Sequence, residues 1–422
     1  MMFLLICLLS VILYQVLVKK DLQHPIIYFY GMFCLPLLFS ILDVYESRIT
    51  VSNLTIVILA LGFLGFGLGS ISNIKFKVGN RKIVELNDSL EYSFIWIYVL
   101  LFISVVFNVF MTITTIMFLK RGYDYSSIRD LLFDYSGADT SYFKTTFYST
   151  FYSWIATPST YVISIVFLVD LFENKLNKFV KVIFFINIGL YIWATGSRLI
   201  ILIMVIESFF LLQYYKIHVS KRVKKYVIRI GILMIIGMFI LSSFRTKTNI
   251  SQVRDVSSIY AYFNIPIPLL SYWTEQVNDK NIYGYGYGFF NGIMQFISYC
   301  FGKIGIEFQS YSKTAIQLYM PQEKWIQIYD GHWYNAFCTL FYNFYVDFRL
   351  PGVFIESYIF GIICKYFYRK ACVLKEKIFL LTYLGVLQII IASFLRWQFG
   401  AFTYIVTIIF TMLCVKKGKK NE

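Results

Sequence analysis

A histidine in a short polar and aromatic stretch is the strongest candidate for chemistry in this sequence. The 422 residues include three histidines, and His332 lies in the run 330–335 (DGHWYN). A partly buried imidazole that titrates near neutral pH can take a proton from a substrate hydroxyl, so His332 is a candidate general base. The alternative is a histidine that only hydrogen-bonds a backbone carbonyl. No second His or Cys lies close to His332 in the sequence, so we expect no metal site there.

Ser197 and Arg198 open an apolar run directly after Gly196. Ser197 is suited to cap a helix, which would place Arg198 in the first turn. The helix dipole disfavours a cation there by up to about 1 kcal/mol, whereas free amides beside a guanidinium suit a phosphate. The alternative is an arginine that reaches out to lipid headgroups.

Two further arginines, Arg245 and Arg254, follow the apolar run 226–244. A cation is favoured at a helix C-terminus, so simple anchoring is the stronger interpretation of Arg245. Arg198 and Arg245 at adjacent helix ends would nevertheless suit a diphosphate, and Arg254 could share that role.

Aromatic residues accompany these cations. The run 283–288 (YGYGYG) places Tyr285 on a flexible backbone, and Trp273 and Trp333 lie in the same long segment 245–333. Flat rings can cover the C–H face of a sugar. The alternative, which the residue types alone favour, is an aromatic belt at a membrane surface. Glu207 lies within an apolar run, where a charge is costly, and its role stays open.

The composition shows which elements position these residues. The chain is 58% hydrophobic, 20% aromatic and only 15% charged, with a mean hydropathy of +0.65. A soluble domain averages about 25% charged residues. The net charge of +16 lies between apolar runs instead of on one basic face, which argues against nucleic-acid binding. The seven cysteines form no CxxC pair and predict neither a zinc site nor a disulfide framework.

The apolar runs predict an all-α, polytopic bundle of about 11 (10–12) transmembrane helices, at about 20 residues a span. They fall near 2–18, 25–43, 53–72, 92–119, 147–170, 179–195, 199–215, 226–244, 352–368, 378–395 and 399–415. Most of the 39 Lys and Arg residues lie on one side if the N-terminus is outside and the C-terminus inside. We expect residues 2–18 to be a membrane anchor and not a cleaved signal peptide, because Lys19 and Lys20 follow the apolar run.

Three regions follow: helices 1–8 in 1–244, a large extracytoplasmic loop in 245–351, and helices 9–11 in 352–422. A loop of this length is usually functional. Within it, 334–347 is apolar but too short to span and reads as a half-helix in the outer leaflet, with the sharp turn expected at Pro351-Gly352.

This arrangement resembles the O-antigen polymerase and ligase superfamily. The resemblance rests on Gly196-Ser197-Arg198 opening a helix, a basic hairpin, and a long outer loop that ends at His332 and Asn335. The stretch from Asn335 to Gly352 is similar to the Asn–aromatic–Asp-Phe-Gly pattern of that family. Arg349 stands where the pattern commonly has glycine, so the sharp turn is expected at Pro351-Gly352 instead.

The resemblance implies an inverting, metal-independent and cofactor-free glycosyl transfer at the outer face of the cytoplasmic membrane. The donor would be a glycan on undecaprenyl diphosphate. Arg198, Arg245, Ser197 and Arg254 would bind the diphosphate and His332 would be the general base. Trp273, Tyr285, Trp333, Asn335 and Asp347 would bind sugars. A flippase and a chain-length regulator of the same pathway are the expected partners.

Within the superfamily, the aromatic segment 334–347 favours a polymerase of repeat units over a ligase. Two other classes stay open. A flippase for lipid-linked oligosaccharides would have short loops on both faces, which the long segment 245–333 argues against. A membrane-bound O-acyltransferase also uses a histidine but takes its acyl donor from the cytoplasm, whereas His332 is predicted to lie outside.

Overall fold

The computed structural model describes residues 1–72, 91–123, 128, 131–132, 146–215, 229, 232, 256, 258–306, 324–335, 337–374 and 378–416. Six helices in this part of the chain are long and apolar enough to cross a membrane: Pro25–Leu42, Asn53–Ile71, Phe94–Lys120, Tyr152–Glu173, Lys178–Thr195 and Thr339–Val373. Shorter apolar helices cover Met2–Val18, Leu199–Tyr214, Ile378–Ala392 and Phe402–Leu413. A helical membrane protein is thereby confirmed. The total of eleven spans stays a prediction, and the run 226–244 lies almost wholly outside the described residues.

The chain divides into two compact units. Unit 1 consists of Met1–Val84, Thr248–Val373 and Val386–Phe402, and unit 2 of Glu85–Lys247, Leu374–Gly385 and Thr403–Glu422. Each unit combines N-terminal with C-terminal residues, so neither coincides with the three regions expected from the sequence.

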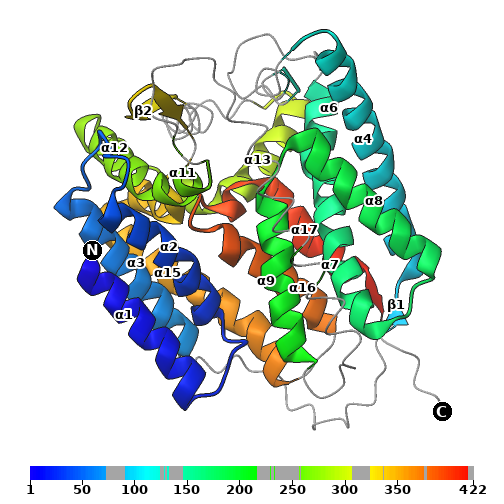
Figure 1. Cartoon of the computed structure of the whole chain (residues 1–422), viewed down its shortest axis with the longest axis horizontal. Helices are drawn as coiled ribbons and strands as arrows, with labels where there is room; N and C mark the ends of the chain where they lie inside the picture. Colours follow the sequence, from blue (N-terminus) through cyan, green and yellow to red (C-terminus); the bar gives the residue numbers. More distant parts are fainter. Residues whose placement is uncertain are drawn as a thin grey trace. The chain divides into compact units, whose positions relative to one another are not determined.

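Unit 1 carries both the helices that open the chain and the described part of the predicted large loop. Its elements are α1 (Met2–Leu13, continued by a π-helical turn to Val18), α2 (Pro25–Leu42), α3 (Asn53–Ile71), α11 (Ser258–Asn264), α12 (Pro266–Asp279), α13 (Tyr287–Lys303), β2 (Ile326–Tyr329), β3 (His332–Tyr334) and α15 (Thr339–Tyr368). The described part of 245–333 thus contains three helices and a β-hairpin, drawn in yellow-green to yellow in Figure 1.

Unit 2 is built from β1 (Glu91–Tyr92), α4 (Phe94–Lys120), α6 (Thr146–Phe151), α7 (Thr157–Glu173), α8 (Lys178–Thr195), α9 (Leu199–Tyr214), most of α17 (Phe402–Leu413) and β4 (Val415–Lys416). The helix α16 (Ile378–Ala392) contributes to both units. Strands β1 and β4 pair antiparallel, with Tyr92 opposite Val415.

Local signals at the helix ends explain several of these boundaries. His24 caps α2 by accepting the Ile26 N–H at its Nδ1 (3.3 Å), and Pro25 occupies the first helical position, where its missing N–H costs nothing. Ser52 caps α3 through the Thr55 N–H at 3.3 Å. The helix α8 ends at Gly196, whose φ of +56° is a conformation that glycine adopts without strain.

Glycines hold α3 against α15, and the two helices lie side by side in Figure 1. A Cβ at Gly65 would lie 2.4 Å from the Phe354 carbonyl oxygen, and one at Gly69 would lie 2.1 Å from that of Tyr358. Gly361 of α15 has the same relation to α3, with the Phe66 carbonyl at 2.4 Å. The hydrophobic effect does not drive helices together in lipid, so close packing must do so. Small residues of this kind let helix backbones approach closely enough for that packing.

The helix α15 is interrupted by a sharp turn. Phe348 and Arg349 leave helical geometry, and Arg349 has φ +58° and ψ −143°. A Cβ at Gly352 would lie 2.4 Å from the Phe344 carbonyl oxygen. Eight residues of straight helix span about 12 Å, so the chain bends sharply between Phe344 and Gly352.

This turn corrects two expectations. It falls at Phe348-Arg349 and not at Pro351-Gly352. Pro351 instead lies at the start of the second half of α15, where a proline is tolerated, and Gly352 provides the close approach to Phe344. The short half-helix is present, but it begins at Thr339, because His332–Tyr334 form a strand.

Unit 2 holds its helices together with a buried polar layer. The Asn108 side-chain amide of α4 donates to the Asn187 Oδ1 of α8 at 2.9 Å and to the Thr160 hydroxyl of α7 at 3.2 Å. Ser104 completes the layer, with its Oγ 2.7 Å from the Thr160 Oγ1. Hydrogen bonds across helices are a common means of association in membranes, each worth about 0.6 kcal/mol.

Candidate functional site

His332 lies on a two-stranded hairpin. Strands β2 and β3 pair antiparallel, with His332 opposite Tyr329, and Asp330-Gly331 form the turn. Gly331 has a φ of +71°, which glycine supplies at no steric cost. The His332 side chain is half-buried, and the hairpin fixes where its backbone runs.

An arginine of the loop between α2 and α3 fixes the turn of this hairpin. The Arg48 Nε donates to the Asp330 Oδ1 at 2.6 Å, and its backbone N–H donates to the Ile328 carbonyl at 2.8 Å. The ion pair is open to water, with the Asp330 side chain 81% exposed, so its charge contributes little stability. The ion pair instead fixes a position, because it ties the turn beside His332 to residues 43–52.

A buried network anchors the other side of the hairpin. Tyr329 is 1% exposed and its hydroxyl accepts the Asn264 Nδ2 at 2.6 Å. Asn264 also receives the Ser40 hydroxyl at its Oδ1, at 3.0 Å. Burial raises the pKa of Tyr329 well above its usual value, so the phenol keeps its proton. The strand opposite His332 is therefore bound to both α11 and α2.

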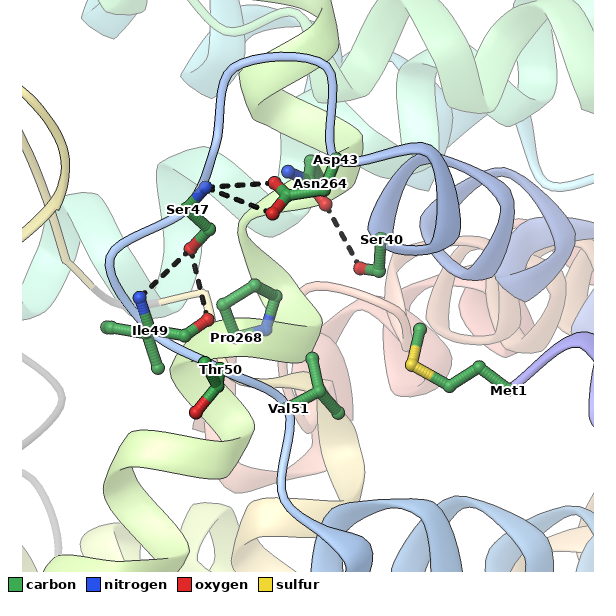
Figure 2. Close-up of a pocket in the computed structure, with 9 residues that line it drawn as sticks. All are labelled: Met1, Ser40, Asp43, Ser47, Ile49, Thr50, Val51, Asn264 and Pro268. Atoms are coloured by element: carbon green, nitrogen blue, oxygen red, sulfur yellow. Dashed lines mark hydrogen bonds between the residues drawn. The ribbon is translucent and has the colours of Figure 1, made fainter.

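A small cavity lies at this network (Figure 2). It measures about 220 Å³ and is lined by Met1, Ser40, Asp43, Ser47, Ile49, Thr50, Val51, Asn264 and Pro268. The Asp43 carboxylate accepts the Ser47 N–H at 2.9 Å and 3.1 Å, which fixes the loop wall. The lining combines Ser, Thr, Asp and Asn side chains with the apolar Met1, Ile49, Val51 and Pro268. Asn264 links this cavity to the hairpin, since it lines the one and hydrogen-bonds the other.

The other predicted site residues in this region follow His332 directly. Trp333 is 55% exposed on β3, so its ring is open to a ligand, and Asn335 is half-buried just after the strand. His332 and Trp333 are neighbours on β3 and Asn335 follows the strand, so the three lie on one short segment.

Arg198 lies in unit 2, at the start of α9. The helix begins one residue later than expected, so that Arg198 and not Ser197 is the N-cap residue. The Ser197 N–H donates to the Thr195 Oγ1 at 3.2 Å, which closes the tight turn after α8. Both side chains are half-buried. A guanidinium at the free amides of a 16-residue helix remains suited to an anion.

The predicted diphosphate site draws on two more arginines, Arg245 and Arg254, which lie outside the described residues. His332 belongs to unit 1 and Arg198 to unit 2. That these residues share one site stays a prediction.

The tyrosine–glycine run 283–288 is fixed to the turn of α15. Asp347 is fully buried, and its two carboxylate oxygens accept the backbone N–H groups of Gly288 and Phe289, each at 2.8 Å. A Cβ at Gly284 would lie 2.1 Å from the Asp347 Oδ1, so only glycine fits there. Asp347 therefore caps α13 and positions the run.

Two predicted sugar-binding residues are thus inside the protein. Trp273 is 3% exposed within α12, and Asp347 is also hydrogen-bonded by the Glu356 side chain. A hydrogen bond between two carboxyl groups requires that one of them carries a proton. Sugar contact by Trp273 or Asp347 stays a prediction, and it would require these helices to move. Tyr285, in contrast, is 71% exposed.

Sequence reasoning missed the residues that position the hairpin. Arg48 and Asn264 lie 282 and 65 residues from their partners Asp330 and Tyr329, and no local spacing connects them. Glu207, whose role was open, is fully buried in α9. Within the described residues, no group of three or more His, Cys, Asp and Glu side chains is placed to hold a metal ion.

Comparison with known proteins adds no relative: no protein-family model, no curated protein and no solved structure matches this chain.

Proposed function

We propose that the chain is a glycosyltransferase that joins oligosaccharide repeat units carried on undecaprenyl diphosphate into a surface polysaccharide. The reaction would take place at the outer face of the cytoplasmic membrane. The helices, which are compatible with a bilayer, would admit the polyprenyl chains, and the predicted outer segment 245–351 would bind the glycan.

One observation carries the proposal. His332 lies half-buried on a hairpin that Arg48 holds at Asp330 in the turn and Asn264 holds at Tyr329, opposite His332. Asn264 also lines a small cavity of mixed polar and apolar side chains. A general base works only if its position is fixed relative to the hydroxyl that it deprotonates. The fixed position of the hairpin supports the proposal that His332 acts as a base on a sugar hydroxyl.

The proposed step is a single displacement. The acceptor hydroxyl gives its proton to the neutral imidazole of His332, and its oxygen attacks the anomeric carbon of the donor from the side opposite the diphosphate. The glycosidic C–O bond forms as the sugar–phosphate C–O bond breaks, and the electron pair leaves with undecaprenyl diphosphate. Arg198, with Arg245 and Arg254, would counter the charge that develops on that leaving group. The configuration at the anomeric carbon inverts.

Single substitutions test this proposal in cells. In a strain that lacks the gene, His332→Ala and Arg198→Ala should each give protein that is inserted and abundant but should leave single repeat units on the lipid carrier. The matched controls are His218→Ala, at a histidine in a predicted cytoplasmic loop, and Arg121→Ala, at an exposed arginine just after α4. Both controls should restore the long-chain ladder. A normal ladder with His332→Ala and Arg198→Ala would overturn the assigned roles.

A further inference from the structure

A strained tyrosine stands at the tip of the run 283–288. Gly284 and Tyr287 close a tight turn, in which the Tyr287 N–H donates to the Gly284 carbonyl at 2.9 Å. The two central residues, Tyr285 and Gly286, have φ of +50° and +91°. Two successive positive φ values are those of a type I′ turn, in which Gly, Asn and Asp dominate. An aromatic residue at the first of these positions is a conformational outlier.

A second strained residue lies close to the same turn. Arg349, at the break of α15, has φ +58° and ψ −143°, where glycine would be relaxed. Its guanidinium carbon lies 4.1 Å from the centre of the Tyr283 ring, and its Nη2 donates to the Val277 carbonyl at 3.3 Å. The Tyr283 and Tyr285 rings stack, with centres 5.8 Å apart and planes 26° from parallel.

These contacts form a series from the interior to the surface. Arg349 is half-buried, Tyr283 is 36% exposed and Tyr285 is 71% exposed. Gly284 and Gly288 lie against Asp347 and hold the backbone inward, so the tyrosines project from it. The outermost ring, Tyr285, therefore stacks on a second ring that is itself backed by the Arg349 guanidinium, yet most of its surface is open.

A membrane-surface belt does not explain this arrangement. Belt tyrosines need only exposure, and any relaxed backbone position supplies that. Asn278, Asp279, Lys280 and Asn281, just before the run, are all exposed and polar, which places this end of α12 toward water. Strain that persists at an exposed position points to a function for the side chain.

We propose that Tyr285, supported by Tyr283 and Arg349, is a stacking subsite for one pyranose ring of the glycan. The exposed ring would cover the C–H face of the sugar, and the supporting stack would keep the ring from rotating away. Only the identification of the ligand as a glycan rests on the proposed function.

Two substitutions separate binding from structure. Tyr285→Gly and Tyr285→Asn remove the ring and place residues that accept a positive φ, so thermal stability should be unchanged or higher. Tyr285→Phe keeps the ring and serves as the matched control. The probe is a set of soluble oligosaccharides released by mild acid from the organism's own surface polysaccharide, titrated by calorimetry onto protein in lipid nanodiscs.

The proposed subsite predicts that the Gly and Asn variants bind these oligosaccharides about tenfold more weakly, whereas the Phe variant stays within about twofold of the wild type. Equal binding by all four proteins would overturn the subsite, as would wild-type binding no stronger than that of empty nanodiscs. Tyr285-dependent binding without chain extension would refute the proposed function and leave the subsite standing. Chain extension that does not depend on Tyr285 would support the proposed function and refute the subsite.

Discussion

The Asp347 carboxylate accepts the backbone N–H of Gly288 at 2.8 Å, across 59 residues of chain. It accepts the next N–H, that of Phe289, at the same distance, so one buried side chain satisfies two of the free amides that begin α13. The bond joins the tyrosine–glycine run to the break of α15, and it therefore determines where Tyr283 and Tyr285 stand.

Asp347→Ala should destabilise the protein strongly. It leaves two buried N–H groups without an acceptor, which we expect to cost about 3 kcal/mol, and it removes the hydrogen-bond partner of Glu356. The apparent Tm in detergent checks this. It is measured by size-exclusion chromatography of samples that have been heated to increasing temperatures.

The matched control is Asp330→Ala. Asp330 also contacts a partner from elsewhere in the chain, Arg48, but its side chain is 81% exposed. Its loss should cost less than about 1 kcal/mol. Equal Tm values for the two variants would contradict the larger loss of stability that we expect on removing the buried Asp347 carboxylate.

Gly69→Ala should separate α3 from α15. The new Cβ would lie 2.1 Å from the Tyr358 carbonyl oxygen, and a backbone atom cannot move aside without shifting its helix. We expect a loss of about 1–3 kcal/mol, visible as a lower Tm and a lower yield of folded protein.

Gly31→Ala in α2 should raise the stability of the protein instead of lowering it. Nothing lies within 4 Å of a Cβ at Gly31, so alanine should stabilise this helix by about 0.5–1 kcal/mol. If Gly69→Ala were as stable as Gly31→Ala, the close packing of α3 on α15 would be refuted.

Acid should destabilise the protein through His24. Burial lowers the pKa of His24 to about 4, and nearby Lys365 acts in the same direction while Asp21 opposes it. The unfolded chain takes up this proton below about pH 6.5, whereas the folded protein resists it until about pH 4. Stability should therefore fall as the pH falls through that window, by at most about 3 kcal/mol.

His24→Asn isolates this contribution. Asparagine can still cap α2, so the fold should persist, but its side chain does not titrate. The wild type should lose more Tm than His24→Asn between pH 6.5 and 4. Parallel curves for the two proteins would assign the acid sensitivity to other groups.

The sequence was sufficient to predict the helical membrane class, because hydropathy over about 20 residues is a local signal. It also placed the helix starts at Pro25, Asn53 and Leu199 to within a few residues, since caps and apolar onsets are local as well. The half-helix before the break of α15 was likewise visible as an apolar run too short to span.

The position of the break was not predictable in the same way. Proline and glycine at 351 and 352 are the usual turn residues, but the strained conformation falls on Phe348 and Arg349. Contacts far apart in sequence decide this: Asp347 is fixed by α13, and Arg349 by Tyr283 and the Val277 carbonyl. The same reason hid Arg48 and Asn264, whose partners a single sequence does not reveal.

The most direct test of the account uses purified protein in lipid nanodiscs, the undecaprenyl-diphosphate-linked repeat unit and a chelator, with no other enzyme. The account predicts a ladder of lengthening lipid-linked glycans on a gel for the wild type, and only the single unit for His332→Ala. The control is the same substrate added to cell membranes that contain the wild-type protein, where it should be extended. If the membranes extend the substrate but the purified wild-type protein forms no glycosidic bond, the central claim is contradicted.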